Sequence, residues 1–322
     1  MCLITDYTLN EVIKMSKQNN SNSSDGIYKN LINQIEKIDR NCTEKSYATR
    51  ARYKVGMERF ARYLSDEYRL TNIKNIKAKH IISYCSYLTD TKQASSSFIK
   101  TELSSIRFYH RHSGGKNILP TNSQLNIEPR HPKEYTRGFM DSELTDLKRY
   151  SKEVGRLDVY HGINLSSTFG LRLNELVSEI TPQKLSSALQ EKELHVVGKG
   201  GMERYIQILD EKQIKAIEEA LSYANERGLK ANDKLLVKDN DKGGVLRCKR
   251  SLQAFLSNHQ NEFRNPNRGE LVETNKKVAK TLTWHSARHY YAENLYSKLY
   301  EETKDKEYSK RFVSENLGHH RL

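Results

Sequence analysis

Apolar residues recur at helical intervals in the first half of the chain. The clearest stripe steps by four, three and four residues and consists of Tyr53, Met57, Phe60 and Leu64. This spacing keeps the side chains on one face, so it predicts an amphipathic helix. A second helix is predicted over about 77–89, with core contacts at Ile81, Ile82 and Tyr84 to Leu88. A third is predicted from about Ser95 to His112, with Ile99, Leu103 and Ile106 facing the core.

Polar and proline-rich segments flank these helices. Residues 1–42 are predicted to be a polar extension, with a flexible tract from Gln18 to Gly26 and a short helix on either side. Three of the five prolines fall in a segment that we predict to run extended, because proline removes a backbone donor and disfavours helix before it. The predicted organisation is an extension at 1–42, a helical domain at 43–115, a linker at 116–134 and a second domain at 135–322.

The second half of the chain mixes helices with a small β-hairpin. Helices are predicted from Asp141 to about Lys152 and at about 158–179, 210–227, 248–263 and 285–301. Between them, Leu194 to Val197 and Arg204 to Ile208 have the composition of strands, and the glycine-rich segment from Gly198 to Gly201 joins them as a turn. The pattern predicts a mainly α fold with a small β-sheet.

Charge adds a candidate partner. The chain has 54 Lys+Arg against 40 Asp+Glu, a formal net charge of +14, and residues 43–113 have a net charge of +8. Such a balance favours a polyanion such as nucleic acid, with a basic protein that has no such partner as the alternative. The polar face of the third helix consists of Lys100, Ser104, Arg107 and Arg111. Side chains one turn apart can reach successive phosphates, so we favour DNA contact over a solvated surface for these four.

Cysteine usage and the absence of targeting signals bear on location. Cys2, Cys42, Cys85 and Cys248 lie far apart and form no C-x-x-C pair, which argues against a zinc ribbon or a disulfide framework. The N-terminus lacks the pattern of a signal peptide, and no apolar run approaches the length of a membrane span. We expect a cytoplasmic protein without a membrane segment, a bound metal or a cofactor.

An ordered set of basic residues suggests chemistry on a phosphate. It consists of Arg172 in Gly-Leu-Arg-Leu-Asn-Glu, Lys199 in Gly-Lys-Gly-Gly, His285 and Arg288 in His-Ser-Ala-Arg, and His319 in Leu-Gly-His. Taken singly, each has a structural explanation: Arg172 as the partner of Glu175, Lys199 as a solvated turn residue, the histidines as core residues or, less readily, metal ligands. Together they could bind one phosphate and move protons on and off its ester oxygens. We therefore predict that all five converge on one site.

These motifs resemble, in order and spacing, those of the tyrosine recombinase (phage integrase) family, over about residues 43–322. The resemblance implies a two-domain, C-shaped clamp with a helical, SAM-like core-binding domain and a catalytic domain. It implies site-specific DNA recombination or integration of a mobile genetic element, without a cofactor, on double-stranded DNA and in a tetrameric synapse. Type IB topoisomerases use similar residues, but this compact order of motifs is that of a recombinase.

The same resemblance implies a role for each residue. Arg172 and Arg288 would bind the scissile phosphate, for which a planar and permanently charged guanidinium is suited, and Glu175 would orient Arg172. Lys199 would protonate the departing 5′ oxygen, His285 would serve the nucleophile as acid or base, and His319 would donate to the phosphate. The nucleophile would be a tyrosine that forms a 3′-phosphotyrosyl intermediate.

That tyrosine follows the last histidine of the family by about nine residues, whereas only His320, Arg321 and Leu322 follow His319 here. The five tyrosines from Tyr290 to Tyr308 all precede it. We expect residues 1–322 to bind DNA without forming a covalent adduct, with the nucleophile near where position 328 would fall. The rival hypotheses are a non-catalytic DNA-binding protein derived from a recombinase, and a basic helical protein that binds nucleic acid without specificity.

Overall fold

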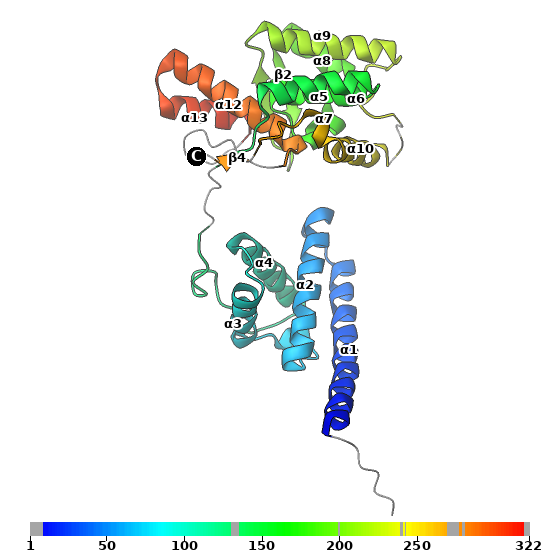
Figure 1. The fold of residues 1–322 in the computed structure, drawn as a ribbon, viewed down its shortest axis with the longest axis vertical. Helices are drawn as coiled ribbons and strands as arrows, with labels where there is room; N and C mark the ends of the chain where they lie inside the picture. Colours follow the sequence, from blue (N-terminus) through cyan, green and yellow to red (C-terminus); the bar gives the residue numbers. More distant parts are fainter. Residues whose placement is uncertain are drawn as a thin grey trace, which may run out of the picture. The chain divides into compact units, whose positions relative to one another are not determined.

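The computed structural model describes residues 9–129, 135–198, 200–238, 241, 243–268, 277–278 and 281–318; the side chains of 9–22, 135–136 and 277–278 are not described. Contacts divide the chain into unit 1, Met1–Pro132, and unit 2, Lys133–Leu322, which we describe separately (Figure 1). Both units are mostly helical, which confirms the predicted fold class. No helix in the described part of the chain is long and apolar enough to cross a membrane.

Unit 1 is a small helical body (Figure 1). Its described elements are the α-helices α1 (Leu9–Asn41), α2 (Tyr47–Tyr68), α3 (Ala78–Ser86) and α4 (Ser96–His112) with two short turns, η1 (Ile73–Asn75) and η2 (Tyr87–Thr91). Helix α2 packs against both α1 and α4. The predicted apolar stripe of α2 is confirmed, since Met57, Phe60 and Leu64 are fully buried and Tyr53 partly so. Side-chain caps at Ser46 and Ser95 set where α2 and α4 begin.

The polar tract from Gln18 to Gly26, predicted to separate two short helices, lies within a single helix instead. Helix α1 runs through it without interruption. The tract is tied to α2, because Ser24 donates to Asp66 and Asp25 pairs with Arg62 at 2.6 Å. Farther along α1, Leu31 and Ile35 belong to the core of unit 1. The local composition therefore favoured a loop, and contacts with a distant helix decided the conformation.

Two other predictions for unit 1 need correction. Ile82, predicted as a core contact, is 53% exposed, because the face of α3 that packs on the core carries Ile81 and Tyr84. The proline-containing segment begins as a packed structure: Leu119, Leu125 and Ile127 lie against the core of unit 1. Apolar burial of these three side chains holds the first part of the predicted linker on unit 1.

Unit 2 surrounds a central helix, α6 (Leu157–Phe169), which is buried along most of its length and contacts α5 (Asp141–Glu153), α9 (Glu211–Glu226) and α12 (Trp284–Thr303). The other described helices are α7 (Leu173–Glu179), α8 (Pro182–Glu191), α10 (Gly244–Asn258), α11 (Gln260–Phe263) and α13 (Lys306–Asn316). Of these, α8 and α13 were not predicted. Strands β1 (Tyr135–Thr136) and β4 (Lys277–Val278) pair in parallel.

The predicted hairpin is confirmed. Strand β2 (Glu193–Val197) pairs antiparallel with β3 (Glu203–Gln207), in a register that sets Val196 opposite Arg204. Alternation along the strands turns Leu194, Val196 and Ile206 into the core. Arg204 has the same parity as Ile206, and it is buried as well.

The single helix predicted over about 158–179 is two helices with a sharp corner. Helix α6 is capped at its end by Gly170, whose φ of 61° lies in the left-handed region that glycine adopts without strain. A side chain at this position would also collide with the ring of Tyr291 on α12. The chain then turns extended at Arg172, the residue before α7. This corner places Arg172 and Glu175 side by side.

Unfolding of the protein is expected to become easier as the pH falls from 6.5 towards 4, because of His161. This residue of α6 is buried and stacks on Tyr223. Burial lowers the pKa of His161 to about 4, with Glu219 opposing the shift and Lys152 adding to it. Below pH 6.5 the unfolded chain then binds a proton that the folded chain excludes, which lowers stability by roughly 1–2 kcal/mol after allowing for solvent screening. Urea unfolding across this pH range measures the effect.

The variant His161→Phe keeps the aromatic stack and removes the titrating group. It is expected to flatten the dependence of the unfolding free energy on pH between 6.5 and 4. An unchanged slope in this variant would show that other groups cause the acid sensitivity.

Candidate functional site

Three arginines from three separate elements converge on one carboxylate in unit 2. Glu175, on α7, is 1% exposed. It accepts from Arg172 Nη1 at 2.6 Å and from Arg204 Nη2 at 2.6 Å, and Arg288 Nη1 lies 3.9 Å from its Oε2. One buried negative charge therefore faces three positive charges. An anion that enters here meets an excess of positive charge.

Glu175 has a second task in the same place. The backbone N–H of Arg172 donates to Glu175 Oε2 at 2.8 Å, which is the return bond of a capping box at the start of α7. The carboxylate thus fixes both the backbone and the side chain of Arg172. The Arg172 side chain remains 30% exposed, so it can reach solvent or a ligand while its ion pair with the buried Glu175 fixes its position.

Arg288 approaches from α12 and is almost fully buried. Its guanidinium donates to the carbonyl oxygens of Gly170, at the α6–α7 corner, and of Leu317, at the end of α13. Burial lowers the pKa of Arg288, and the charges of Arg204 and Arg172 act in the same direction. The Leu317 carbonyl also accepts from Arg172 Nη2, at 3.4 Å. This oxygen therefore marks a point that both predicted phosphate-binding arginines reach.

Lys199 and His319 lie outside the described residues, but their neighbours in sequence border the cluster. A Cβ built on Gly198 would lie 3.1 Å from Glu175 Oε1 and 3.5 Å from Arg172 Nη1. A Cβ built on Gly318 would lie 3.3 Å from Arg204 Cδ. Gly198 and Gly318, which precede Lys199 and His319 in the sequence, thus lie beside the arginine cluster.

His285 lies in the first turn of α12 and is exposed. It precedes Arg288 by one helical turn, so the two side chains lie on the same side of α12. Its ring contacts that of His289, with centroids 4.8 Å apart. Of the predicted site residues, the structure brings Arg172, Glu175 and Arg288 together and places His285 one turn from them.

Three solved structures show the same fold. The first is lambda integrase(75–356), a dimer bound to a COC′ core site, with 14% sequence identity, a TM-score of 0.57, and coverage of 90% of this chain and 94% of that chain. The second is the Tn1549 transposon integrase (aa 82–397) in complex with circular intermediate DNA, with 16% identity, a TM-score of 0.51, and coverage of 91% and 92%. The third is the XerH site-specific recombinase bound to difH substrate, with 18% identity, a TM-score of 0.53, and coverage of 90% and 78%. A comparison with curated proteins gives no significant match.

Sequence comparison extends the likeness. The family profile described as "Phage integrase, N-terminal" matches residues 28–119, in unit 1, and the profile described as "Integrase" matches residues 147–294, in unit 2. The second range includes Arg172, Glu175, Arg204 and Arg288. The chain belongs to the tyrosine recombinase family.

Sequence reasoning missed one member of this recombinase's arginine cluster. Arg204 was predicted to lie in a strand but was given no role. The signal was present in the alternation of the strand, because Ile206 faces the core and Arg204 lies two residues before it. An inward-facing arginine in a hairpin strand needs a buried anion, and Glu175 supplies it.

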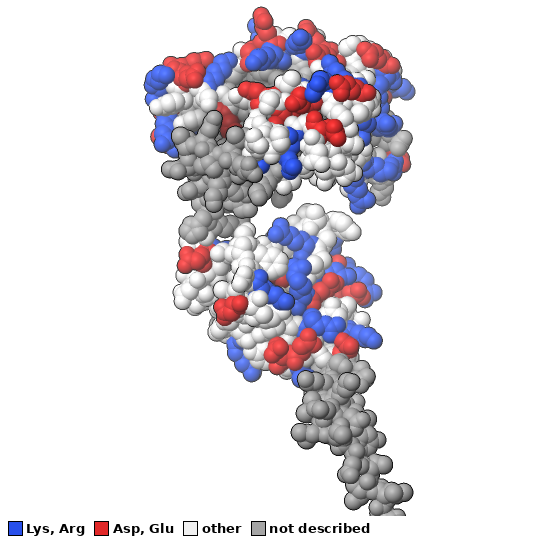
Figure 2. Space-filling model, in the orientation of Figure 1, with Lys and Arg blue, Asp and Glu red and all other residues white. Residues whose placement is uncertain are grey.

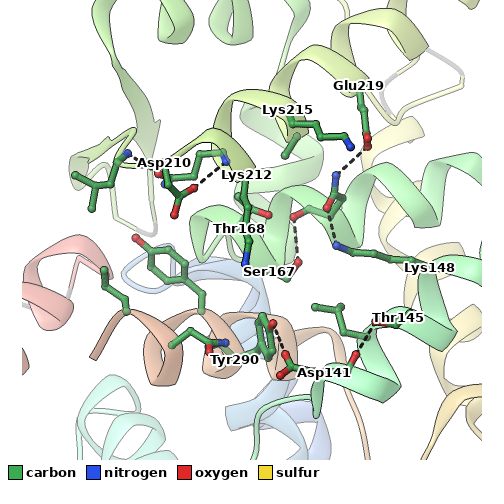
Figure 3. Close-up of a pocket in the computed structure, with 18 of the residues that line it drawn as sticks. Asp141, Thr145, Lys148, Ser167, Thr168, Asp210, Lys212, Lys215, Glu219 and Tyr290 are labelled. Atoms are coloured by element: carbon green, nitrogen blue, oxygen red, sulfur yellow. Dashed lines mark hydrogen bonds between the residues drawn. The ribbon is translucent and has the colours of Figure 1, made fainter. Parts of the chain in front are cut away.

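A large cavity in unit 2 lies away from the arginine cluster. It measures about 600 Å³ between α5, α6, α9 and α12, and none of the three clustered arginines lines it. Figure 3 shows Lys148 and Glu219 on its wall. Lys148 donates to Asn164 at 2.7 Å, and Asn164 donates to Glu219. These groups satisfy one another, so we interpret their network as structural.

Unit 1 of the recombinase holds the residues predicted to contact DNA, and the structure divides them. Lys100 donates to the Glu128 carbonyl at 2.7 Å, and Arg107 donates to the Pro120 carbonyl and to Asn122. These two side chains hold the segment that follows α4, and Arg107 is half-buried there. Arg107 is therefore not fully exposed to solvent, and its contact with DNA remains a prediction.

Ser104 and Arg111, the other two residues of the predicted α4 face, have different contacts. Ser104 donates to the Lys100 carbonyl within α4. Arg111 is exposed and pairs with Glu44 at 2.8 Å. Glu44 also pairs with His112, which lies 3.6 Å from Cys42 Sγ. We interpret this group as an ion-pair network that ties the residues before α2 to the end of α4.

Helix α2 adds basic residues that the sequence analysis had not assigned to DNA. Figure 2 shows Lys and Arg side chains gathered over the part of unit 1 where α2 runs. Arg52 of α2 donates to Thr101 of α4 at 3.4 Å, so it lies at the edge of the predicted α4 face. Arg59 also extends from α2 towards α4, where it pairs with the buried Glu102 at 2.6 Å. A DNA contact on this side would draw on both helices.

Proposed function

We propose that this tyrosine recombinase binds double-stranded DNA and carries out site-specific recombination, integrating a mobile genetic element by cleaving and rejoining strands. The observation that carries the proposal is the cluster in which Arg172, Arg204 and Arg288 share one buried carboxylate. Excess positive charge at a fixed position suits the phosphate of a strand-transfer reaction, whose transition state places negative charge on nonbridging oxygens.

In this proposal Arg172 and Arg288 bind the scissile phosphate. The Leu317 carbonyl oxygen shows where an acceptor receives both side chains, and a phosphate oxygen at that point would gain two charge-assisted hydrogen bonds. Glu175 holds Arg172 in place and does not touch the substrate. His319 would add a third donor to the phosphate.

The remaining roles concern bonds and protons. A tyrosine oxygen attacks the phosphorus and the bond to the 5′ oxygen breaks, leaving a 3′-phosphotyrosyl link. Lys199 gives its proton to the departing 5′ oxygen, and His285 takes the proton of the tyrosine hydroxyl. Attack by the freed 5′ hydroxyl of another strand reverses these steps and rejoins the DNA.

Two tyrosines near the cluster do not fit the role of nucleophile. Tyr290 donates its hydroxyl to Asp141 at 2.6 Å, and burial raises its pKa to about 12. Tyr291 is buried against Gly170, and burial likewise raises its pKa to about 12. Both shifts disfavour the phenolate that attack requires. The family's nucleophile is instead the tyrosine that follows the last histidine.

We expect residues 1–322 to bind duplex DNA without becoming covalently attached to it. The test traps cleavage on a nicked duplex, which loses the short strand and cannot be rejoined, followed by denaturing electrophoresis. A version of the polypeptide lengthened at its C-terminus, so that a tyrosine follows His319 at the spacing of the family, is expected to form the adduct. An adduct formed by residues 1–322 and lost in Tyr308→Phe would make Tyr308 the nucleophile.

This trapping experiment also separates the proposal from its main alternative, a non-catalytic DNA-binding protein derived from a recombinase. If the extended polypeptide binds its DNA tightly and forms no adduct, the alternative holds. We further propose that the protein acts on cytoplasmic DNA and assembles as a tetramer there, since a tetramer of lambda integrase has been solved on a Holliday junction.

DNA affinity is expected to fall steeply with salt, because Lys and Arg side chains release counterions from phosphates. Replacing Lys100, Arg107 and Arg111 together by glutamine should weaken binding and reduce the slope of log Kd against log [salt] by up to about three, at roughly 0.9 per phosphate contact. Glutamine is chosen because it can still donate to the Pro120 carbonyl that Arg107 holds. Fluorescence anisotropy over a salt series gives both quantities.

A matched control removes three exposed charges from α1 of the same unit, in Lys29→Gln, Lys37→Gln and Arg40→Gln. It changes the net charge equally and is expected to leave the slope nearly unchanged. If both triple variants shift the slope to the same extent, the α4 face makes no specific phosphate contacts.

A further inference from the structure

We propose that Arg204 is a positioning residue that fixes the hairpin turn carrying Lys199, and the segment leading to His319, against the arginine cluster. The proposal rests on the function proposed above, because it concerns how the proton donor and the last histidine come to the phosphate. Arg204 would not touch the substrate. It would act through the elements that it joins.

The contacts of Arg204 reach three parts of unit 2. From β3, its guanidinium donates to Glu175 Oε2 at 2.6 Å, to the Gly170 carbonyl at 3.4 Å and to the Asn316 carbonyl at 3.2 Å. One side chain therefore ties the hairpin to the α6–α7 corner and to the end of α13. The three acceptors are divided between the two terminal nitrogens of the planar guanidinium, whereas an ammonium offers its donors from a single nitrogen.

Burial of this charge needs a reason beyond stability. The Arg204 side chain is only 5% exposed, and its Nε has no hydrogen-bond partner among the described residues. Burial lowers the pKa of Arg204, which shows the cost of the charged form here. Its neighbours on the same face of the hairpin, Val196 and Ile206, are apolar, and an apolar residue would pack at this position without desolvating a charge. We infer that the charge is kept because it sets geometry.

We infer that Arg204 sets the geometry of the turn between β2 and β3. The Gly198 N–H donates to the Met202 carbonyl at 2.7 Å, and Gly198 lies against Glu175 and Arg172. In the proposal, the anchoring of β3 also positions Lys199, which is the next residue in the sequence. At the other end, Gly318 lies on the aliphatic part of Arg204, immediately before His319. A shift of about 1 Å in a reacting group is sufficient to cost roughly 100-fold in rate.

The first test needs no catalysis and uses residues 1–322. Arg204→Met removes the tie, and Arg204→Lys keeps the charge and the fold but reaches fewer acceptors. Both variants are expected to speed hydrogen exchange of the Gly198 and Gly318 amides on the order of tenfold, with little change in α9. Glu203→Gln, on the outward face of the same strand, is the matched control. Unchanged exchange at Gly198 and Gly318 in both variants overturns the proposal.

The second test separates placement of Lys199 from a general structural role. It measures cleavage by the protein that includes the nucleophilic tyrosine, on duplexes with either oxygen or sulfur at the 5′ bridging position of the scissile phosphate. A 5′ thiolate departs without a proton, so the sulfur duplex does not need Lys199. Arg204→Lys is expected to slow cleavage of the oxygen duplex about 100-fold and of the sulfur duplex less than about tenfold.

The outcomes distinguish this proposal from the function on which it rests. Equal slowing on both duplexes would mean that Arg204 supports the phosphate-binding arginines and does not position the proton donor. Absence of cleavage by the unsubstituted protein on both duplexes would contradict the proposed function itself, whatever the exchange of Gly198 shows. Faster exchange with an unchanged rate on the oxygen duplex would also overturn the positioning role.

Discussion

Replacing Arg172 by alanine is expected to slow DNA strand cleavage by roughly 100- to 1000-fold, the usual cost of removing one fixed donor from a developing negative charge. Arg172 is the partly exposed member of the cluster, and Glu175 holds it from behind. DNA affinity should change much less, because most binding energy comes from phosphates along the whole duplex. Cleavage of a nicked duplex by the protein that includes the nucleophilic tyrosine, with anisotropy for binding, measures both.

Arg149→Ala is the matched control for this substitution. Arg149 lies in the same unit and is exposed, and among the described residues its ion-pair partner is Asp146, one turn away on α5. The substitution Arg149→Ala removes one positive charge, as Arg172→Ala does, and should leave the cleavage rate within a few-fold of that of the unsubstituted protein. A similar loss of affinity and of cleavage rate in Arg172→Ala would show that Arg172 acts as an ordinary DNA contact and not at the scissile phosphate.

The second large effect is expected on stability. Glu175→Gln preserves the shape of the side chain but leaves three guanidinium groups without their shared anion. Removing one partner of a buried ion pair costs about 3–5 kcal/mol, because the charges left behind are desolvated and repel one another. The free energy of unfolding in urea, followed by the fluorescence of Trp284 in unit 2, is the measurement.

Two comparisons make this prediction specific. Glu179, on α7 like Glu175, forms a partly exposed pair at 2.8 Å with Lys184 of α8. Breaking this pair in Glu179→Gln should cost less than about 1 kcal/mol. The double variant Glu175→Gln/Arg204→Met removes one of the three guanidinium charges that Glu175→Gln leaves without an anion. It is expected to recover part of the lost free energy of unfolding. If Glu175→Gln costs no more than Glu179→Gln, the arginines are not held by a shared buried charge.

Much of the fold could be predicted because its signals are local. The spacing of Met57, Phe60 and Leu64 defines one face of α2 whatever surrounds it, and the caps at Ser46 and Ser95 act within one helical turn. The β2–β3 hairpin is local in the same sense, with ten paired residues joined by a short glycine-rich turn. Errors arose where a distant contact outweighed local composition, as at the polar tract of α1 and in the segment packed by Leu125 and Ile127.

The candidate site divides along the same line. By itself, the sequence determined the order of the motifs, the family that they resemble, and the nearness of Glu175 to Arg172, since three residues separate these two. It could not show that Arg204 joins them, that Arg288 lies buried against Gly170 and Leu317, or that Gly198 and Gly318 border the same cluster. Those facts depend on contacts between residues far apart in the chain, such as the 29 positions between Arg204 and Glu175 and the 118 between Arg288 and Gly170. They form only when the corner at Gly170, the hairpin and the end of α13 pack together. Charge supplied the attraction, and packing decided which charges meet.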